Sequence, residues 1–455
     1  MRLQVGFSAR DAWWTAGAAF LGAAAFPPLG LWPLALVSVA LFVWIIRDVN
    51  SAQARQVGLL YGFLYALGTM YWFFGLFGVY AISLLALMAG YFGLLATLVG
   101  MTRAYQPLAR AALIALFAVG IEWLRGDAWY LRFPWYTVPH ALAQAPVWIA
   151  PVRWLGVYGF SFMIWCIAAY GALRSRTIWL AFALFPLASL LLSPFQPPDL
   201  QALLVQTEDH ADAEQIISDF PTGKVDLVVF PEYAFPFGLE RVLESKGGPT
   251  LMARKVASPV IFGTVLGEYG QPGFQNVAAV IDEHGCIIDT FPKQRPVPLM
   301  LDGKAGTRRP VIKLDQGTLG LALCYDFDAP EIAGSLTHRG ATLLVAPIGD
   351  LMSWGRVQHL HHELLVRIRA LENDRWLLRA TSSGRTEVID PHGNPSQDGL
   401  AIGETGFVRL KYGHRDSFSL GGQAHILGPV AMALTLLFVI LKAVTLVRNR
   451  RARVP

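Results

Sequence analysis

A cysteine ends a short apolar run in the stretch Gly320-Leu321-Ala322-Leu323-Cys324-Tyr325-Asp326. Residues 319–323 are long enough for one buried β-strand, and polar residues follow the cysteine at once. A side chain at the end of a strand is held rigidly and can still be reached by a substrate, which suits a nucleophile. A single cysteine is more often a small buried apolar residue, so this pattern alone is weak evidence for catalysis.

Two apolar runs upstream end on residues that complement a cysteine nucleophile. Residues 225–230 lead to Glu232, and a second run leads to Lys293. A carboxylate can take the proton of a thiol, and a fixed cation in a dry site can stabilise the oxyanion that forms on the attacked carbonyl. Alone, Glu232 would be read as a surface carboxylate and Lys293 as a solvated turn residue. Together, each just past a strand-like segment, the three residues predict a base, a cation and a nucleophile.

These residues resemble the motifs of the nitrilase (carbon–nitrogen hydrolase) superfamily, whose catalytic triad is Glu, Lys and Cys. The matching stretches are Phe230-Pro231-Glu232, Lys293 with Val297-Pro298, Cys324-Tyr325-Asp326, and the block from Gln358-His359-Leu360 to Arg385. With its apolar segments, and with Glu122-Trp123-Leu124-Arg125 and Phe133-Pro134-Trp135 among them, the chain is most similar to the apolipoprotein N-acyltransferase family. The resemblance covers nearly the whole chain.

The resemblance implies roles for individual residues and an α-β-β-α sandwich for the catalytic domain. Glu232 would be the general base, Lys293 would stabilise the oxyanion, and Cys324 would carry the acyl group as a thioester. The residues expected near the substrate or the oxyanion are Tyr233, Tyr325 and Asp326.

Two features depart from the family pattern. The second glutamate of the family usually follows the lysine by eight residues, but Leu301 stands there and the acid is the next residue, Asp302. We expect Asp302 to be the second carboxylate, because a lysine in a dry pocket tends to lose its proton unless a carboxylate opposes that shift. The alternative is that Asp302-Gly303 is only a turn. Residues 347–354 also differ from the corresponding family segment. The resemblance still implies the same chemistry, but it does not identify the acceptor.

The composition is that of a membrane protein. Of 455 residues, 54% are apolar, and the mean hydropathy is +0.44. The formal net charge of +5 is modest and forms no basic face, so we expect no nucleic-acid partner. Cys166 and Cys286 are interpreted as structural. No CxxC or HxxxH pair is present, and His359, His361 and His362 are interpreted as solvated helix residues, so we expect no metal and no cofactor.

Eight apolar segments predict a membrane α-helical bundle of about eight spans. Seven precede the catalytic region and one follows it: 12–26, 31–46, 57–77, 81–101, 111–124, 157–173, 178–192 and 426–447. The predicted organisation is a transmembrane domain at 1–195, a nitrilase-like catalytic domain at 199–424, and a C-terminal span with a basic tail at 425–455. A soluble protein with buried core helices is the alternative, and so many uncharged segments argue against it.

The arginines between the segments predict the orientation. The N-terminus, alternate short loops and the C-terminal tail carry the positive charge, which marks them as cytoplasmic. These arginines are Arg2, Arg10, Arg47, Arg55, Arg103, Arg110, Arg174, Arg176, Arg448, Arg450, Arg451 and Arg453. Residues 193–423 then lie outside, which predicts a bacterial cytoplasmic (inner) membrane protein whose catalytic domain is periplasmic.

Strand-like and helix-like segments alternate in the outer part, which predicts a layered α/β domain. The expected strands are 201–206, 225–230, 260–264, 277–281, 287–290, 319–323 and 342–346, and the expected helices are 213–220, 239–256, 330–338 and 357–374. The late arginines are interpreted as ion-pair partners of nearby glutamates rather than as phosphate ligands: Arg367, Arg369, Arg375, Arg379 and Arg385 with Glu363, Glu372 and Glu387.

Three functions fit these features to different degrees. The resemblance favours a membrane N-acyltransferase that takes a fatty acyl chain from a phospholipid onto Cys324 and passes it to the N-terminal amine of a diacylglyceryl-modified apolipoprotein. A membrane-anchored amidase or nitrilase with water as acceptor is the first alternative. A non-catalytic lipid- or peptide-binding protein, or a transporter, is the second, but a transporter should carry polar residues or broken helices at mid-membrane, and only Glu122 approaches that.

Overall fold

The computed structural model describes residues 8–220, 222–245 and 248–451. The chain divides into two compact units. The helical unit comprises Met1–Leu142, Val157–Phe185 and Ala424–Pro455, and the α/β unit comprises Ala143–Gly156 and Pro186–Gln423. Each unit is therefore assembled from segments that are far apart in the sequence.

Helices account for the predicted apolar segments. They are α1 (Ala9–Ala24), α2 (Leu34–Ile46), α3 (Ser51–Thr69), α4 (Phe73–Phe77), α5 (Ala81–Gly100), α6 (Pro107–Trp123), α7 (Val138–Leu142), α8 (Val152–Leu173), the 3-10 helix η4 (Arg176–Leu191) and α15 (Leu427–Arg451). Every one of the eight predicted segments falls on at least one of them.

Four helical stretches in the described part of the chain are long and apolar enough to cross a membrane: Phe73–Gly100, Pro107–Ala128, Val152–Leu173 and Leu420–Asn449. Leu34–Ile46 and Arg176–Leu191 are apolar but shorter. The structure thus supports a membrane protein with four candidate spans, fewer than the eight predicted. The difference arises because α1 has only 16 residues and α3 begins with the polar turn Ser51-Ala52-Gln53, so neither is both long and apolar.

Small residues let the helices of the helical unit pack closely. A Cβ on Gly58 of α3 would lie 2.4 Å from the backbone oxygen of Phe92 on α5, and one on Gly120 of α6 would lie 3.0 Å from Oγ1 of Thr435 on α15. Contacts of this kind are typical of helices that associate in lipid, where no hydrophobic effect drives them together.

The α/β unit contains two sheets. The first has six strands in the order β11-β1-β2-β3-β4-β5, and the second has five in the order β10-β9-β8-β7-β6. The strands of the first are β1 (Leu200–Gln206), β2 (Leu227–Val229), β3 (Val260–Leu266), β4 (Gln275–Ile281), β5 (Ile287–Pro292) and β11 (Gly406–Tyr412). Those of the second are β6 (Val311–Leu314), β7 (Gly317–Leu321), β8 (Leu343–Ile348), β9 (Trp376–Thr381) and β10 (Glu387–Ile389).

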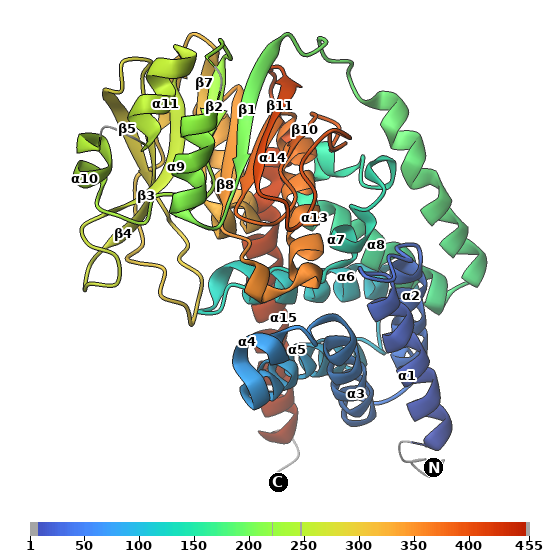
Figure 1. Cartoon of the computed structure of the whole chain (residues 1–455). Helices are drawn as coiled ribbons and strands as arrows, with labels where there is room; N and C mark the ends of the chain where they lie inside the picture. The colour runs from blue at the N-terminus through green and yellow to red at the C-terminus, as the bar shows by residue number, and fades with distance from the viewer. Residues whose placement is uncertain (1–7, 221, 246–247, 452–455) are drawn as a thin grey trace. The chain divides into compact units, whose positions relative to one another are not determined.

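Side chains that alternate along β1 show how the layers pack. Ala202 and Leu204 belong to a core shared with the second sheet, while Leu203 and Val205 belong to a core with α9 (His210–Asp219). Further helices cover the sheets: α10 (Leu239–Glu244), α11 (Gly248–Val256), α12 (Pro330–His338) and α13 (Arg356–Asn373), and the short α14 (Leu420–Gln423) packs on α12 and α13. Figure 1 shows α9 and α11 beside the strands of the first sheet. The layers are helix, sheet, sheet and helix, so the predicted layered α/β domain is confirmed.

Two details of the predicted elements differ from the structure. Strands β6, β9, β10 and β11 were not predicted, and the single helix expected at 239–256 is the pair α10 and α11. Gly248 adopts a left-handed backbone conformation (φ 63°) and Pro249 follows it, which explains why one helix does not run through this region.

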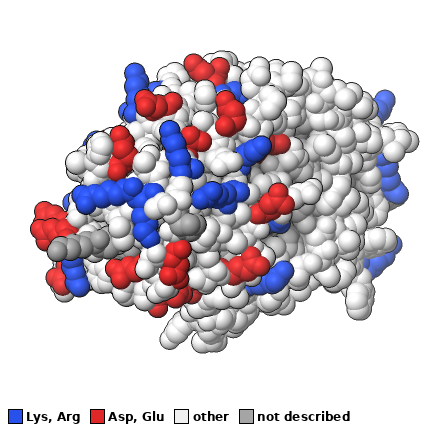
Figure 2. Space-filling view, turned by 45° about the horizontal axis from the view of Figure 1, so that its top comes forward, with Lys and Arg blue, Asp and Glu red and all other residues white. Residues whose placement is uncertain are grey.

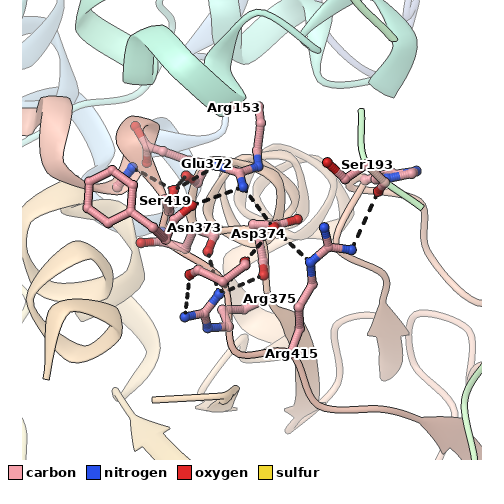
Figure 3. Close-up of polar contacts among 12 residues, drawn as sticks. Arg153, Ser193, Glu372, Asn373, Asp374, Arg375, Arg415 and Ser419 are labelled. Atoms are coloured by element: carbon pink, nitrogen blue, oxygen red, sulfur yellow. Dashed lines mark hydrogen bonds and ion pairs between the residues drawn. The ribbon is translucent and has the colours of Figure 1, made fainter. Parts of the chain in front are cut away.

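An ion cluster around Asp374 ties distant segments of the α/β unit together (Figure 3). Asp374 Oδ2 lies 2.8 Å from Nη2 of Arg153 and 2.7 Å from Nε of Arg415, and it accepts a 2.5 Å hydrogen bond from Oγ of Ser417. Arg415 also donates to the backbone oxygen of Pro194 at 3.1 Å. Segments from three parts of the chain therefore meet at one buried carboxylate, and Arg415 connects a fourth to it.

Charged side chains on the face shown in Figure 2 are of both signs and interspersed. Opposite charges placed side by side largely cancel beyond the Debye length, so this face presents no extended field of one sign.

Candidate active site

The three predicted catalytic residues lie at strand ends of the α/β unit. Glu232 follows β2, Lys293 follows β5, and Cys324 opens the 3-10 helix η5 (Cys324–Asp328) after β7. All three are buried. Lys293 Nζ lies 2.8 Å from Oε1 of Glu232, so the structure brings the predicted base and the predicted cation into direct contact.

Asp302 lies beside the same lysine. Its Oδ2 is 2.6 Å from Lys293 Nζ and accepts a 2.7 Å hydrogen bond from the backbone N–H of Val297. The Tyr233 hydroxyl donates to Asp302 Oδ1 at 2.9 Å. Asp302 is thus held by several donors and directed at Lys293.

Asn276 completes this network and was not predicted from the sequence. It is fully buried on β4, and its Nδ2 donates to Glu232 Oε1 at 2.7 Å and to Asp302 Oδ1 at 2.8 Å. One amide group therefore fixes the two carboxylates that flank Lys293. An asparagine at the start of the apolar run 277–281 was the available signal, because a polar side chain buried in a strand needs partners.

The turn that carries Glu232 packs directly on β3. A Cβ on Gly263 would lie 2.6 Å from Glu232 Cα and 2.4 Å from the backbone nitrogen of Tyr233. Tyr233 itself has a positive φ of 56°. Only a glycine at position 263 allows this close approach, and the approach sets the position of the carboxylate.

Cys324 sits in a strained turn that holds its thiol in place. Its φ is 45°, in the left-handed region that non-glycine residues seldom adopt. The backbone N–H of Gly349, at the end of β8, donates to the Cys324 sulfur. The Cα of Gly349 also faces the base, since a Cβ there would lie 2.5 Å from Glu232 Oε2. Gly349 therefore lies next to both the nucleophile and the base.

Burial and charge control the protonation of the site. Burial and the nearby Glu232 carboxylate raise the pKa of Cys324 well above its ordinary value, and Lys293 opposes them. Burial raises the pKa of Glu232, against the opposing charge of Lys293. Burial alone would lower the pKa of Lys293, but Asp302 and Glu232 outweigh it and raise that pKa. The resting site thus holds a thiol, a charged lysine and a carboxylate able to accept a proton.

Asp326 faces the backbone rather than an open substrate site. It accepts hydrogen bonds from the backbone N–H groups of Arg295 at 2.7 Å, Gln294 at 3.1 Å and Leu323 at 3.2 Å. Burial raises the pKa of Asp326 to about 6. It ties the segment after Lys293 to the turn of Cys324, while Tyr325 beside it is also buried.

The three histidines of α13 were predicted to be solvated, and that prediction is wrong. His359, His361 and His362 are at most 2% exposed. The helix carries polar residues on nearly all sides, yet most of them are buried because they pair with groups on neighbouring elements. Hydrophobic periodicity does not reveal this arrangement.

The late arginines mostly pair with glutamates, as predicted. Arg367 contacts Glu363 and Arg369 contacts Glu372, while Arg385 Nε lies 3.5 Å from Glu387 Oε2. Arg375 differs, because it donates to the backbone oxygen of Ala341 at 2.6 Å and to Oγ of Ser417 at 3.0 Å.

No group of three or more His, Cys, Asp or Glu side chains in the described ranges is arranged to hold a metal ion. Around Cys324 the chain itself supplies a carboxylate, a lysine ammonium group and a backbone N–H donor, which are groups of the kind that nucleophilic catalysis by a thiol uses.

The family that the α/β region matches gives its class. Residues 188–410 match the family described as carbon-nitrogen hydrolase. Solved structures of similar fold include an amidase from Nesterenkonia sp., 19% identical with a TM-score of 0.38, covering 49% of this chain and 93% of that chain. Another is Nit3 of Saccharomyces cerevisiae, 18% identical with a TM-score of 0.39, covering 48% and 92%.

The helical unit narrows the assignment. Residues 18–170 match the apolipoprotein N-acyltransferase N-terminal domain. The apolipoprotein N-acyltransferase of Azotobacter vinelandii is 28% identical over 432 residues, covering 80% of this chain and 82% of that protein. That of Pseudomonas putida is 29% identical over 440 residues, covering 81% and 84%. Over about four fifths of its length the chain is therefore similar to apolipoprotein N-acyltransferases, and its helical unit carries the N-terminal domain described for them.

Proposed function

We propose that this protein is a membrane N-acyltransferase that moves a fatty acyl chain from a phospholipid, through a thioester on Cys324, to the N-terminal amine of a diacylglyceryl-modified apolipoprotein. One observation carries the proposal: Cys324, Glu232 and the Lys293–Asp302 pair form a buried site in a chain that also has candidate membrane spans. Donor and acceptor both reside in a bilayer, which suits such a chain.

In the first half-reaction, Glu232 takes the thiol proton as the Cys324 sulfur attacks the ester carbonyl of the phospholipid. The carbonyl oxygen becomes an oxyanion, which Lys293 stabilises by its charge. The carbon–oxygen bond to the glycerol then breaks, and the leaving alkoxide takes the proton from Glu232. The products are an acyl thioester and a lysophospholipid.

In the second half-reaction, the acceptor amine attacks the thioester. Glu232 takes a proton from the amine, the oxyanion forms again beside Lys293, and the carbon–sulfur bond breaks. The sulfur recovers its proton from Glu232, and an amide remains on the acceptor. A thioester suits this step because amines attack it faster than an oxygen ester.

The membrane arrangement is part of the proposal. Eight spans with the N-terminus and the C-terminal tail in the cytoplasm would put the α/β unit on the periplasmic side of the bacterial inner membrane. The distribution of arginines supports this orientation.

Incubation of the purified protein with a phospholipid labelled in its acyl chain and a diacylated lipopeptide tests the proposal. Label should appear on the lipopeptide amine, and on the protein when the lipopeptide is omitted. A membrane-anchored amidase would instead release ammonia from small amides without phospholipid, and that result with no lipopeptide product would overturn the proposal.

A further inference from the structure

A buried histidine lies next to the active site and takes no part in the steps described above. His362 of α13 is 2% exposed. Its Nδ1 lies 2.7 Å from Oδ1 of Asp350, and its Nε2 lies 3.4 Å from Oδ1 of Asp328. A neutral imidazole has only one N–H, so two ring nitrogens that both face carboxylates indicate the imidazolium form.

The two carboxylates belong to the segments that hold the nucleophile. Asp328 ends η5, the turn that begins at Cys324. Asp350 directly follows Gly349, whose N–H contacts the Cys324 sulfur and whose Cα faces Glu232. His362 therefore bridges the turn of the nucleophile and the backbone segment that lies between nucleophile and base.

Other polar and charged groups contact Asp350 besides His362. Asp350 also accepts hydrogen bonds from Nη2 of Arg379 on β9 at 2.7 Å and from Nε2 of Gln358 at 3.1 Å. Nε2 of His359, on the same helix, donates to the Leu351 backbone oxygen at 2.9 Å, because a carbonyl oxygen can only accept. Arg379 also lies 3.9 Å from Oε1 of Glu387, so the arginine offsets only part of the negative charge around it, and a protonated His362 supplies a further positive charge beside Asp350 and Asp328.

We propose that His362 is a positioning residue for acyl transfer: as an imidazolium between Asp350 and Asp328, it locks the Gly349 segment against the Cys324 turn and offsets negative charge near the sulfur. This inference rests on the proposed function. Without the cation, Asp350 and Asp328 would oppose the negative charge that develops on the Cys324 sulfur and on the substrate oxyanion.

The pKa of His362 makes the role measurable. Burial alone would lower this pKa, but Asp350 and Asp328 outweigh it and raise it to about 9. The groups that face the ring are Asp350, Asp328 and, through Asp350, Arg379 and His359. Protonated His362 is present below pH 9 and lost above it, so Cys324 acylation should decline as the pH rises through about 9.

Single-turnover acylation of Cys324 by labelled phospholipid, with no acceptor present, is the assay. His362→Gln keeps one hydrogen bond to Asp350 but removes the charge, and should slow acylation by about 10-fold or more, the lower end of the loss expected for a preorganised electrostatic group. Asp328→Asn in the His362→Gln background removes the carboxylate left uncompensated and should recover part of the rate. A residue that only fills space would show no such recovery.

Asp328→Asn in the wild-type background provides a variant that keeps the histidine. Losing one of the two carboxylates lowers the pKa of His362, so the alkaline decline should move to lower pH. Thermal melting of each variant identifies any that do not fold. If His362→Gln does not fold, the pH profiles of Cys324 acylation in the wild type and in Asp328→Asn test the role of His362.

The inference is overturned if His362→Gln acylates at the wild-type rate, or if the alkaline decline stays in place in Asp328→Asn. Failure of the wild type itself to form an acyl adduct on Cys324 would be a different result, because it would overturn the proposed function instead.

Discussion

Asp302 Oδ2 lies 2.6 Å from Lys293 Nζ, closer than the 2.8 Å that separates the same nitrogen from Glu232 Oε1. Aspartate is one methylene shorter than the glutamate expected at this site, and it stands one residue later. The backbone of the loop compensates for the shorter side chain and the shifted position. Leu299 and Gly303 both have positive φ, 68° and 78°, and the chain bends there so that Asp302 points toward Lys293. The turn of this loop lies earlier, where the Met300 N–H donates to the Val297 oxygen, and Gly303 instead forms an isolated β-bridge with Gln275, so Asp302 is a partner of Lys293 rather than a turn residue.

Asp302→Asn should slow acylation of Cys324 by roughly 10²-fold, the size typical of a lost preorganised electrostatic group. An amide would remove the charge, and its NH2 group would face a donor in either orientation: Lys293 Nζ and the Val297 N–H on one side, or Asn276 Nδ2 on the other. Single-turnover kinetics with labelled phospholipid measure the effect. Asp282→Asn is the control, since Asp282 accepts backbone N–H groups in an exposed turn and should stay near the wild-type rate. A near-normal rate in Asp302→Asn would mean that the charge of Asp302 does not contribute to catalysis.

Cys324→Ala should abolish acyl transfer without loss of folding, because no other described thiol adjoins Lys293 and Glu232. The wild type should accumulate an acyl adduct sensitive to hydroxylamine when no acceptor is supplied, and mass spectrometry of the peptides should locate it at Cys324. Cys286→Ser is the matched control, since Cys286 is exposed and should be dispensable. An adduct on Cys286 would contradict the assignment of the nucleophile.

Strand ends made much of this site predictable from the sequence. Glu232, Lys293 and Cys324 each follow an apolar run, so the pattern that marks a strand also marks the residue after it. Asn276 was not predicted because it lies within β4, where the periodicity of apolar residues indicates burial but not the partner of a polar side chain. The same limit explains the missed strand β11, whose exposed and buried residues alternate around charged side chains.

Gly349→Ala should slow acylation by about 10-fold or more while leaving the protein folded. The new Cβ would lie 2.5 Å from Glu232 Oε2, and the carboxylate cannot yield freely because Lys293 and Asn276 hold its other oxygen. Small displacements of a catalytic group have large effects on rate. Gly223→Ala, where the nearest atom is 3.4 Å away, is the control. Unchanged kinetics in Gly349→Ala would mean that Glu232 can shift without consequence.

The histidines of α13 show why a helix is harder to interpret than a strand end. Its polar residues suggested a solvated face, yet His362 and Arg369 are buried because charged partners surround them. Burial of paired charges depends on groups brought in from other elements, which a single helical segment does not reveal. The membrane segments differ from α13, because the apolar character of each segment was enough to predict where its helix lies.

Asp374→Asn should destabilise the α/β unit by about 3 kcal/mol, because removing one partner of a buried ion cluster leaves the others uncompensated. Asparagine tolerates the left-handed backbone at this position (φ 54°), so the loss reports the charge facing Arg153 and Arg415. Thermal or denaturant unfolding in detergent measures it. Asp289→Asn, which breaks the more exposed pair with Arg308, should cost about 0.5 kcal/mol or less. Equal effects of the two substitutions would contradict a special role for the cluster.

Orientation in the membrane can be tested with the protein's own cysteine. Cys286 is exposed in the α/β unit, whereas Cys324 is buried and Cys166 is half-buried on α8. A membrane-impermeant maleimide added to spheroplasts should therefore label the wild type, and Cys286→Ser should abolish the labelling. In the Cys286→Ser background, Gly238→Cys should restore it, while Arg55→Cys and Arg103→Cys should react only after the membrane is permeabilised, because positive loops stay in the cytoplasm. Labelling of Arg103→Cys in sealed spheroplasts, or protection of Cys286, would place the α/β unit on the cytoplasmic side and remove a periplasmic lipoprotein as its acceptor.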